Sequence, residues 1–134
     1  MKLFTFFRSE RKDVIRDLVP DNVDKLKWTG KDFHFLITGI VQLDKEDYDK
    51  IMTPTSFKWS RLSNKLPVYN VGKDEYGFSF EKSGIEITFS DTIEFSKAKQ
   101  IADEIVKNIC STGQKVELHV VANSKVYRNC LVLK

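Results

Sequence analysis

The chain has two histidines and two cysteines in 134 residues, and this scarcity limits the metal chemistry that it could support. It contains no Cys-x-x-Cys, His-x-His or His-Glu-x-x-His motif. Glu117 and His119 share one face of a predicted strand, but a metal site needs a third and usually a fourth ligand. An exposed polar strand face is the simpler interpretation of this pair, and the sequence predicts no metal site.

Motifs for phosphate binding and nucleophilic catalysis are also missing. The six glycines are scattered along the chain without a Walker loop or a dinucleotide-binding fingerprint, and no Gly-x-Ser-x-Gly sequence marks a nucleophilic serine. Cys110 and Cys130 fall in a predicted helix and a predicted strand, where we expect small core residues. The sequence therefore predicts no catalytic residues and no cofactor. An enzyme acting on a small polar ligand, with His34 or His119 as its base, is kept as an alternative.

No stretch of the chain is apolar for long enough to cross a membrane. The N-terminus, from Met1 to Arg8, lacks a full hydrophobic region and a cleavage site of small residues, so we do not expect a signal peptide. These absences predict a cytoplasmic protein without membrane contact. In a reducing cytoplasm, Cys110 and Cys130 are expected to be free thiols.

Composition bounds the size and the partners of the protein. A length of 134 residues suits one globular domain, and we expect residues 1–134 to form it. Hydrophobic residues make up 41% of the chain and include ten phenylalanines, which is enough for a real core. The net charge of +3 falls short of the basic footprint of a nucleic-acid-binding protein and leaves that class as an alternative.

The strongest pattern in the chain lies between residues 92 and 112. Apolar residues recur there at intervals of three and four, and polar residues fill the opposite side. This periodicity predicts an amphipathic helix that packs on a sheet, with Ile101, Ile105 and Ile109 almost fully buried. The Asp-x-x-Glu sequence of residues 91–94 resembles a capping box at its start.

Alternating patterns predict the strands of that sheet. Residues 33–43 are partly apolar on both faces, which indicates an interior strand. Residues 76–89 are expected to form a hairpin around a Lys-Ser-Gly turn, and residues 115–133 a second hairpin around Asn-Ser. A short aromatic strand is expected at residues 2–7.

The remaining elements complete the predicted fold class. Two shorter helices are expected at about residues 9–19 and 44–52, the first stopped by Pro20 and the second capped by Asp44. The long helix at about 92–112 would cover one face of a sheet built from hairpins. The predicted architecture is therefore α+β with a mostly antiparallel sheet.

Residues 55–71 are the least regular part of the sequence and supply the candidate binding site. Basic and aromatic residues are interleaved there, and the candidate contact residues are Lys58, Trp59, Arg61, Lys65 and Tyr69. Tryptophan, tyrosine and arginine are common anchors of protein interfaces, and aromatic side chains with cations also suit single-stranded nucleic acids. The competing interpretation is that the aromatic residues pack inward, or that the segment contains unrecognised structure.

These observations favour a small non-enzymatic module that binds another protein through residues 57–69. A toxin-neutralising immunity protein, or another inhibitor of a bacterial or phage protein, is the more specific form of this hypothesis. Its support is the lack of catalytic motifs and of an export signal, together with the aromatic and basic segment. A nucleic-acid-binding domain that uses the same segment is an alternative, as is the enzyme with a histidine base.

Overall fold

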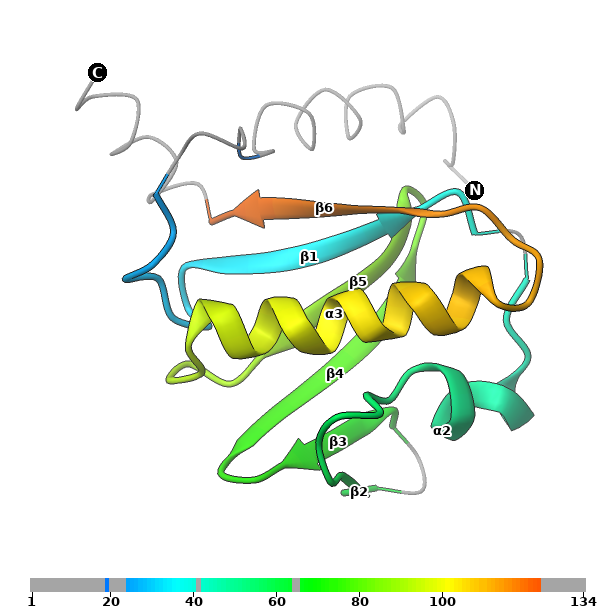
Figure 1. Cartoon of the computed structure of the whole chain (residues 1–134), viewed down its shortest axis with the longest axis horizontal. Helices are drawn as coiled ribbons and strands as arrows, with labels where there is room; N and C mark the ends of the chain where they lie inside the picture. Colours follow the sequence, from blue (N-terminus) through cyan, green and yellow to red (C-terminus); the bar gives the residue numbers. More distant parts are fainter. Residues whose placement is uncertain (1–18, 20–23, 41, 64–65, 124–134) are drawn as a thin grey trace.

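A computed structural model describes residue 19 and residues 24–40, 42–63 and 66–123 of the chain (Figure 1). Six strands form one sheet in the order β2-β3-β4-β5-β1-β6, and the long helix α3 lies across one of its faces. The elements in chain order are β1 (Phe33–Thr38), the 3₁₀ helix η1 (Lys45–Asp47), α2 (Tyr48–Ile51), β2 (Ser60–Arg61), β3 (Val68–Val71), β4 (Asp74–Glu81), β5 (Gly84–Phe89), α3 (Phe95–Cys110) and β6 (Glu117–Ala122).

The prediction of an α+β fold with a mostly antiparallel sheet is confirmed. All neighbouring strands of the described sheet pair antiparallel, and β4 and β5 form the predicted hairpin. β1 lies between β5 and β6, as its apolar pattern on both faces indicates. It ends at Thr38, before the predicted end at residue 43, because Gly39 adopts a φ of 91° that a strand does not allow.

Helix α3 begins after Glu94 and ends at Cys110, inside the predicted range of 92–112. The capping box predicted at residues 91–94 is not formed, because Glu94, and not Asp91, is the N-cap residue, and its side chain makes no capping hydrogen bond. Instead, Thr29 and Glu94 form an isolated antiparallel β-bridge that holds the chain extended at this point. Backbone contacts with a distant segment, and not a local cap, therefore position the start of α3.

Burial confirms that α3 packs on the sheet through its apolar stripe. Ile101, Ile105 and Ile109 are fully buried in the same core cluster as the inward side chains of the sheet. Cys110 is exposed, so the prediction that it is a core residue is wrong. It follows Ile109 by about 100° around the helix axis, which places it beside the buried stripe and not on it. Cys130 lies outside the described residues.

Aromatic side chains fill one end of this core. Phe33, Phe35, Phe89 and Phe95 form a cluster in which five pairs of ring centroids lie between 5.0 and 6.2 Å apart. Trp28 stacks on Phe33 with a centroid separation of 6.4 Å. Tilted and edge-to-face contacts of this kind each add about 0.5–1.5 kcal/mol beyond the burial of apolar area. The excess of phenylalanine in the composition thus serves the core.

The short helix predicted at residues 44–52 is present as η1 followed by a single turn, α2. The Asp44 side chain makes no capping hydrogen bond, contrary to the expectation. The turn ends where the Thr53 hydroxyl donates to the Asp49 carbonyl oxygen at 2.6 Å. Pro54 follows and has no N–H to continue the helix.

Several predicted elements lie outside the described residues. These are the strand at 2–7, the helix at 9–19 apart from its last residue, and the second strand of the hairpin at 115–133. The first strand of that hairpin is present as β6, and the Val19 N–H donates to the Val120 carbonyl oxygen at 3.0 Å. Among the described residues, no helix is long and apolar enough to span a bilayer.

Gly30 is expected to tolerate no side chain. Its N–H donates to the Ile93 carbonyl oxygen at 3.0 Å, and a Cβ atom at this position would overlap the Ser90 carbonyl oxygen. The obstruction is backbone and cannot rotate away, so Gly30→Ala should lower the free energy of unfolding by about 1–3 kcal/mol in urea melts. Lys31→Ala, an exposed neighbour, should change it by less than about 0.5 kcal/mol. Equal stability of the two variants would show that the backbone at Gly30 does not pack against the backbone at Ser90 and Ile93.

Candidate functional site

The segment at residues 55–71 is irregular only in part. It contains β2 and β3, which pair antiparallel with Ser60 opposite Asn70 and Arg61 opposite Tyr69. β2 is the edge strand of the sheet, next to β3 (Figure 1). Of the candidate binding residues, Arg61 and Tyr69 therefore lie in strands, whereas Lys58 and Trp59 precede β2. Lys65 lies outside the described residues.

Two of the candidate residues fasten the edge strand to α2. The Tyr69 ring is fully buried, and its hydroxyl donates to Asp49 Oδ1 at 2.7 Å. Burial and this hydrogen bond raise the pKa of Tyr69 well above its ordinary value. Arg61 donates to the same carboxylate oxygen at 2.7 Å and lies 5.8 Å above the Tyr69 ring. As a buried core residue, Tyr69 offers no contact surface, and the charge of Arg61 is matched within the molecule.

The other two described candidates line a hollow. Trp59 is 37% exposed and packs edge-on against Tyr69, with ring centroids 5.7 Å apart. Lys58 beside it is exposed. We call the surrounding cavity of about 590 Å³ the aromatic hollow, and its lining residues are Asp49, Lys50, Thr53, Pro54, Thr55, Phe57, Lys58 and Trp59. Lys58 and Trp59 are thus the candidate residues that a partner could reach.

A carboxylate from α3 holds one wall of the aromatic hollow. Glu104 Oε1 accepts hydrogen bonds from the Thr55 N–H at 2.7 Å and the Ser56 N–H at 2.9 Å. Burial of the carboxyl group opposes ionisation, but hydrogen bonds from Ser56, Gln100 and Thr55 outweigh it and hold the pKa of Glu104 at about 2. Glu104 was not predicted as a site residue, because in the sequence it is one of several charged residues on the polar side of a helix.

Glu104→Gln is expected to lower stability at neutral pH by at most about 1 kcal/mol, since the carboxylate is accessible to solvent. The folded pKa of Glu104, about 2, lies below its ordinary value of 4.5, so the ionised group stabilises the fold above pH 4.5. That contribution disappears as the pH falls towards 2. The difference in free energy of unfolding between wild type and Glu104→Gln, measured in urea melts, should therefore shrink as the pH falls from 4.5 towards 2. A difference independent of pH would contradict the role of the charge.

Three further apolar side chains are exposed on or just beyond β2, β3 and β4. Leu62, Leu66 and Phe80 are 49%, 61% and 49% exposed. The Leu62 N–H donates to the Val68 carbonyl oxygen at 2.9 Å, and the Val68 N–H donates to the Leu66 carbonyl oxygen at 2.8 Å. The Phe78 N–H donates to the Pro67 carbonyl oxygen at 3.3 Å, which holds the residue after Leu66 against the middle of β4. We call these three exposed side chains the apolar corner.

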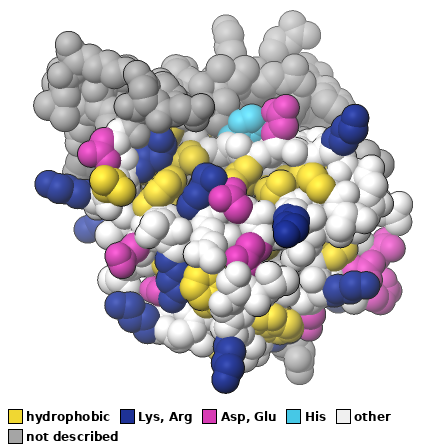
Figure 2. Space-filling model, viewed as in Figure 1, with side chains coloured by type: hydrophobic (Ala, Val, Ile, Leu, Met, Phe, Trp, Pro, Cys, Tyr) yellow, Lys and Arg dark blue, Asp and Glu magenta, His cyan; other side chains and the backbone are white. Residues whose placement is uncertain are grey.

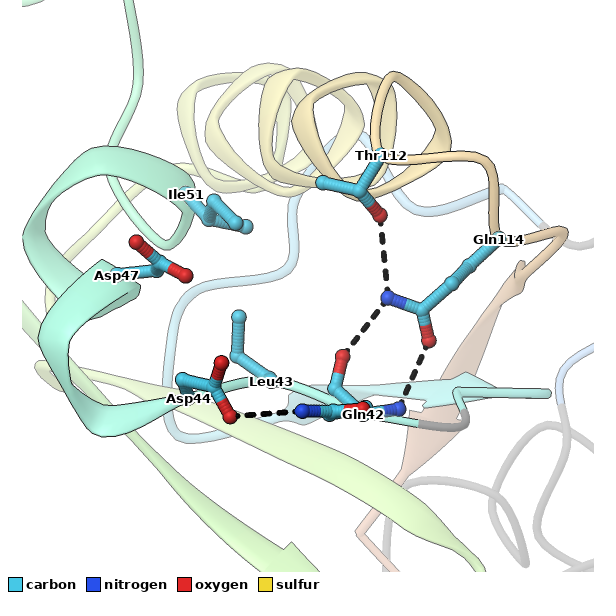
Figure 3. A pocket seen from close by; sticks show the side chains of 7 residues that line it. All are labelled: Gln42, Leu43, Asp44, Asp47, Ile51, Thr112 and Gln114. Carbon is cyan, nitrogen blue, oxygen red and sulfur yellow. Dashed lines mark hydrogen bonds between the residues drawn. The ribbon is translucent and has the colours of Figure 1, made fainter.

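Two further hollows lie on the other side of α2. The acidic hollow, of about 310 Å³, is lined by Gln42, Leu43, Asp44, Asp47, Ile51, Thr112 and Gln114 (Figure 3). Its two carboxylates lie on the η1 side, opposite Thr112 and Gln114. The Gln114 amide accepts from the Gln42 N–H at 2.9 Å and donates to the Gln42 carbonyl oxygen at 2.7 Å, which ties this wall together. The middle hollow, of about 260 Å³, is lined by Asp47, Lys50, Ile51, Asn108, Ser111 and Thr112.

The two histidines lie on the sheet face opposite α3 and away from the hollows. His34 Nε2 is 3.1 Å from Glu86 Oε2, and the hydrogen bond between them lowers the pKa of Glu86. His119 Nε2 is 3.0 Å from Thr38 Oγ1 and 3.7 Å from Glu117 Oε1, so Glu117 and His119 share a face as predicted. Neither histidine lines any of the three hollows. These contacts link β1 to its neighbours β5 and β6.

The described residues show no cluster of metal ligands, and the face in Figure 2 shows no patch of one charge. In the part of the chain that the structure describes, no three His, Cys, Asp or Glu side chains converge as a metal site would require. On the face shown in Figure 2, lysine and arginine side chains are interspersed with aspartate and glutamate. This arrangement gives no particular support to binding of a nucleic-acid backbone.

No protein-family model, curated protein or solved structure matches this chain. The features of the molecule that bear on its function are therefore the hollows, the apolar corner and their charges.

Proposed function

We propose that the protein is a non-enzymatic module that binds another protein through the aromatic hollow and the apolar corner. The observation that carries the proposal is the exposure of Leu62, Leu66, Phe80 and Trp59, which lie on or just beyond the neighbouring strands β2, β3 and β4. Single exposed apolar side chains are ordinary on protein surfaces. Several of them on neighbouring strands, with Trp59 lining the aromatic hollow, favour an interaction site. Aromatic residues such as Trp59 are also frequent anchors of protein interfaces.

The narrower proposal is a cytoplasmic inhibitor, such as an immunity protein that neutralises a toxin. An inhibitor needs a rigid contact surface and no chemistry of its own. The Asp49 contacts to Arg61 and Tyr69 brace the edge strand in this way. The product of a neighbouring gene is the first partner to test, by co-expression and by rescue of growth if that product is toxic.

The contact surface is tested by co-purification of that candidate partner with Leu66→Asp. Leu66 is 61% exposed, so the variant should keep the wild-type melting temperature and lose the partner. Leu26→Asp is the matched control, because Leu26 is 84% exposed but lies outside the apolar corner, and it should retain the partner. Loss of binding in both variants, or in neither, would exclude the apolar corner as the contact surface.

Alanine substitution of Trp59 and Arg61 would be a poorer test. Trp59 contacts the buried Tyr69 ring, and Arg61 neutralises Asp49 at 2.7 Å. Removing either side chain loosens the edge strand itself, so lost binding would not be separable from lost folding. Substitutions of exposed side chains avoid this ambiguity.

A further inference from the structure

The three hollows follow one another around η1 and α2. The acidic hollow shares Asp47, Ile51 and Thr112 with the middle hollow. The middle hollow in turn shares Lys50 with the aromatic hollow. Because neighbouring hollows have lining residues in common, they form one interrupted groove. We call it the α2 groove.

The two ends of the α2 groove carry opposite charges. Asp44 and Asp47 line the acidic hollow, whereas Lys50 and Lys58 line the aromatic hollow. Within the described part of the chain, none of these four side chains forms an ion pair. Asp44 accepts a hydrogen bond from the neutral Gln42 amide at 2.9 Å, which leaves its charge uncompensated. Both ends therefore present charge to a ligand.

Asp49 also lines the aromatic hollow but does not cancel its positive charge. Its Oδ1 atom accepts from Arg61 and from the Tyr69 hydroxyl, each at 2.7 Å. The cation of Arg61 therefore matches the anion of Asp49. The ionised Glu104 adds one negative charge to a wall of the hollow, so Lys50 and Lys58 leave one positive charge in excess. Phe57 and Trp59 add apolar surface beside them.

We propose that the α2 groove binds an extended segment of the partner protein with a fixed direction of charge. The segment carries an acidic side chain next to an apolar one for the aromatic hollow, and a basic side chain for the acidic hollow. This inference rests on the proposed function and adds the chemistry of the partner. A segment bound in the opposite direction would place like charges in contact, which is unfavourable and so sets the direction.

The inference is tested by selecting peptides from a displayed library of random twelve-residue sequences. The wild-type protein should enrich peptides in which an acidic and a basic residue recur at a constant spacing. Lys58→Glu should abolish the acidic preference alone, and Asp44→Lys the basic preference alone. Both residues are exposed, so the melting temperatures should not change. In a selected peptide, replacing the acidic residue by lysine should weaken binding at least about tenfold.

Each contrary result has a defined meaning. Selected peptides without the charge pattern, or a pattern that neither variant changes, would overturn the inference. If no peptide is selected while the whole partner still binds in a Leu66-dependent manner, the inference falls and the proposed function stands. Binding of a dT20 oligonucleotide that Lys58→Glu abolishes would overturn the peptide proposal in favour of nucleic acid. A dimer that Lys58→Glu dissociates in sedimentation would identify a second copy of the chain as the occupant.

Discussion

Replacing Ile105 with alanine is expected to lower the free energy of unfolding by about 2–5 kcal/mol. Ile105 lies on the buried stripe of α3, is fully buried, and belongs to the core cluster that includes the inward side chains of the sheet. The truncation removes apolar contacts and leaves a cavity. A close-packed core cannot collapse fully around such a cavity, which adds to the loss of burial.

Urea-induced unfolding followed by circular dichroism measures this loss. Lys107→Ala is the matched control on the same helix, because Lys107 is exposed and should contribute less than about 0.5 kcal/mol. A loss below about 0.5 kcal/mol for Ile105→Ala would contradict the packing of α3 on the sheet.

The long helix and the central strands were predictable because their side-chain periods coincide with their burial. Ile101, Ile105 and Ile109 recur at helical intervals and are all fully buried. β2 and β3 were not recognised, because they span two and four residues and Pro67 interrupts the segment between them. Strands this short carry too few alternations to show a pattern, and their pairing depends on β4.

The candidate site was predictable only in part. A basic and aromatic composition located Lys58 and Trp59, but it could not separate them from Tyr69, whose place in β3 turns its ring into the core. The residues that shape the site are distant from one another in sequence. Asp49 is 12 residues from Arg61 in sequence, and Glu104 is 49 residues from Thr55. Such pairings follow from the packing of α2 and α3 and leave no local signal.

Lys97→Met is expected to destabilise the fold by about 3–5 kcal/mol, because it leaves a buried carboxylate without its counter-ion. Lys97 Nζ lies 2.8 Å from Asp74 Oδ2 and donates to the Val71 carbonyl oxygen at 3.1 Å. The Asp74 side chain is only 2% exposed, and no described residue donates a hydrogen bond to its buried Oδ1 atom. Loss of the lysine would leave this anion without its cation and without access to water. The same ammonium group joins the first turn of α3 to the β3–β4 turn.

Replacing the partner residue, Asp74, should lower the free energy of unfolding much less than replacing Lys97. This difference tests whether the buried carboxylate is the costly group. In Asp74→Asn the lysine loses its anion, but the Lys97 side chain is 26% exposed and can turn to water, so we expect a loss of about 1–2 kcal/mol. The double variant Lys97→Met with Asp74→Asn should be more stable than Lys97→Met alone, because the buried group is then neutral. Urea melts of the two single variants and the double variant give the coupling energy directly. Additive losses, or a Lys97→Met variant within about 1 kcal/mol of wild type, would show that the pair does not stabilise the joint between α3 and the sheet.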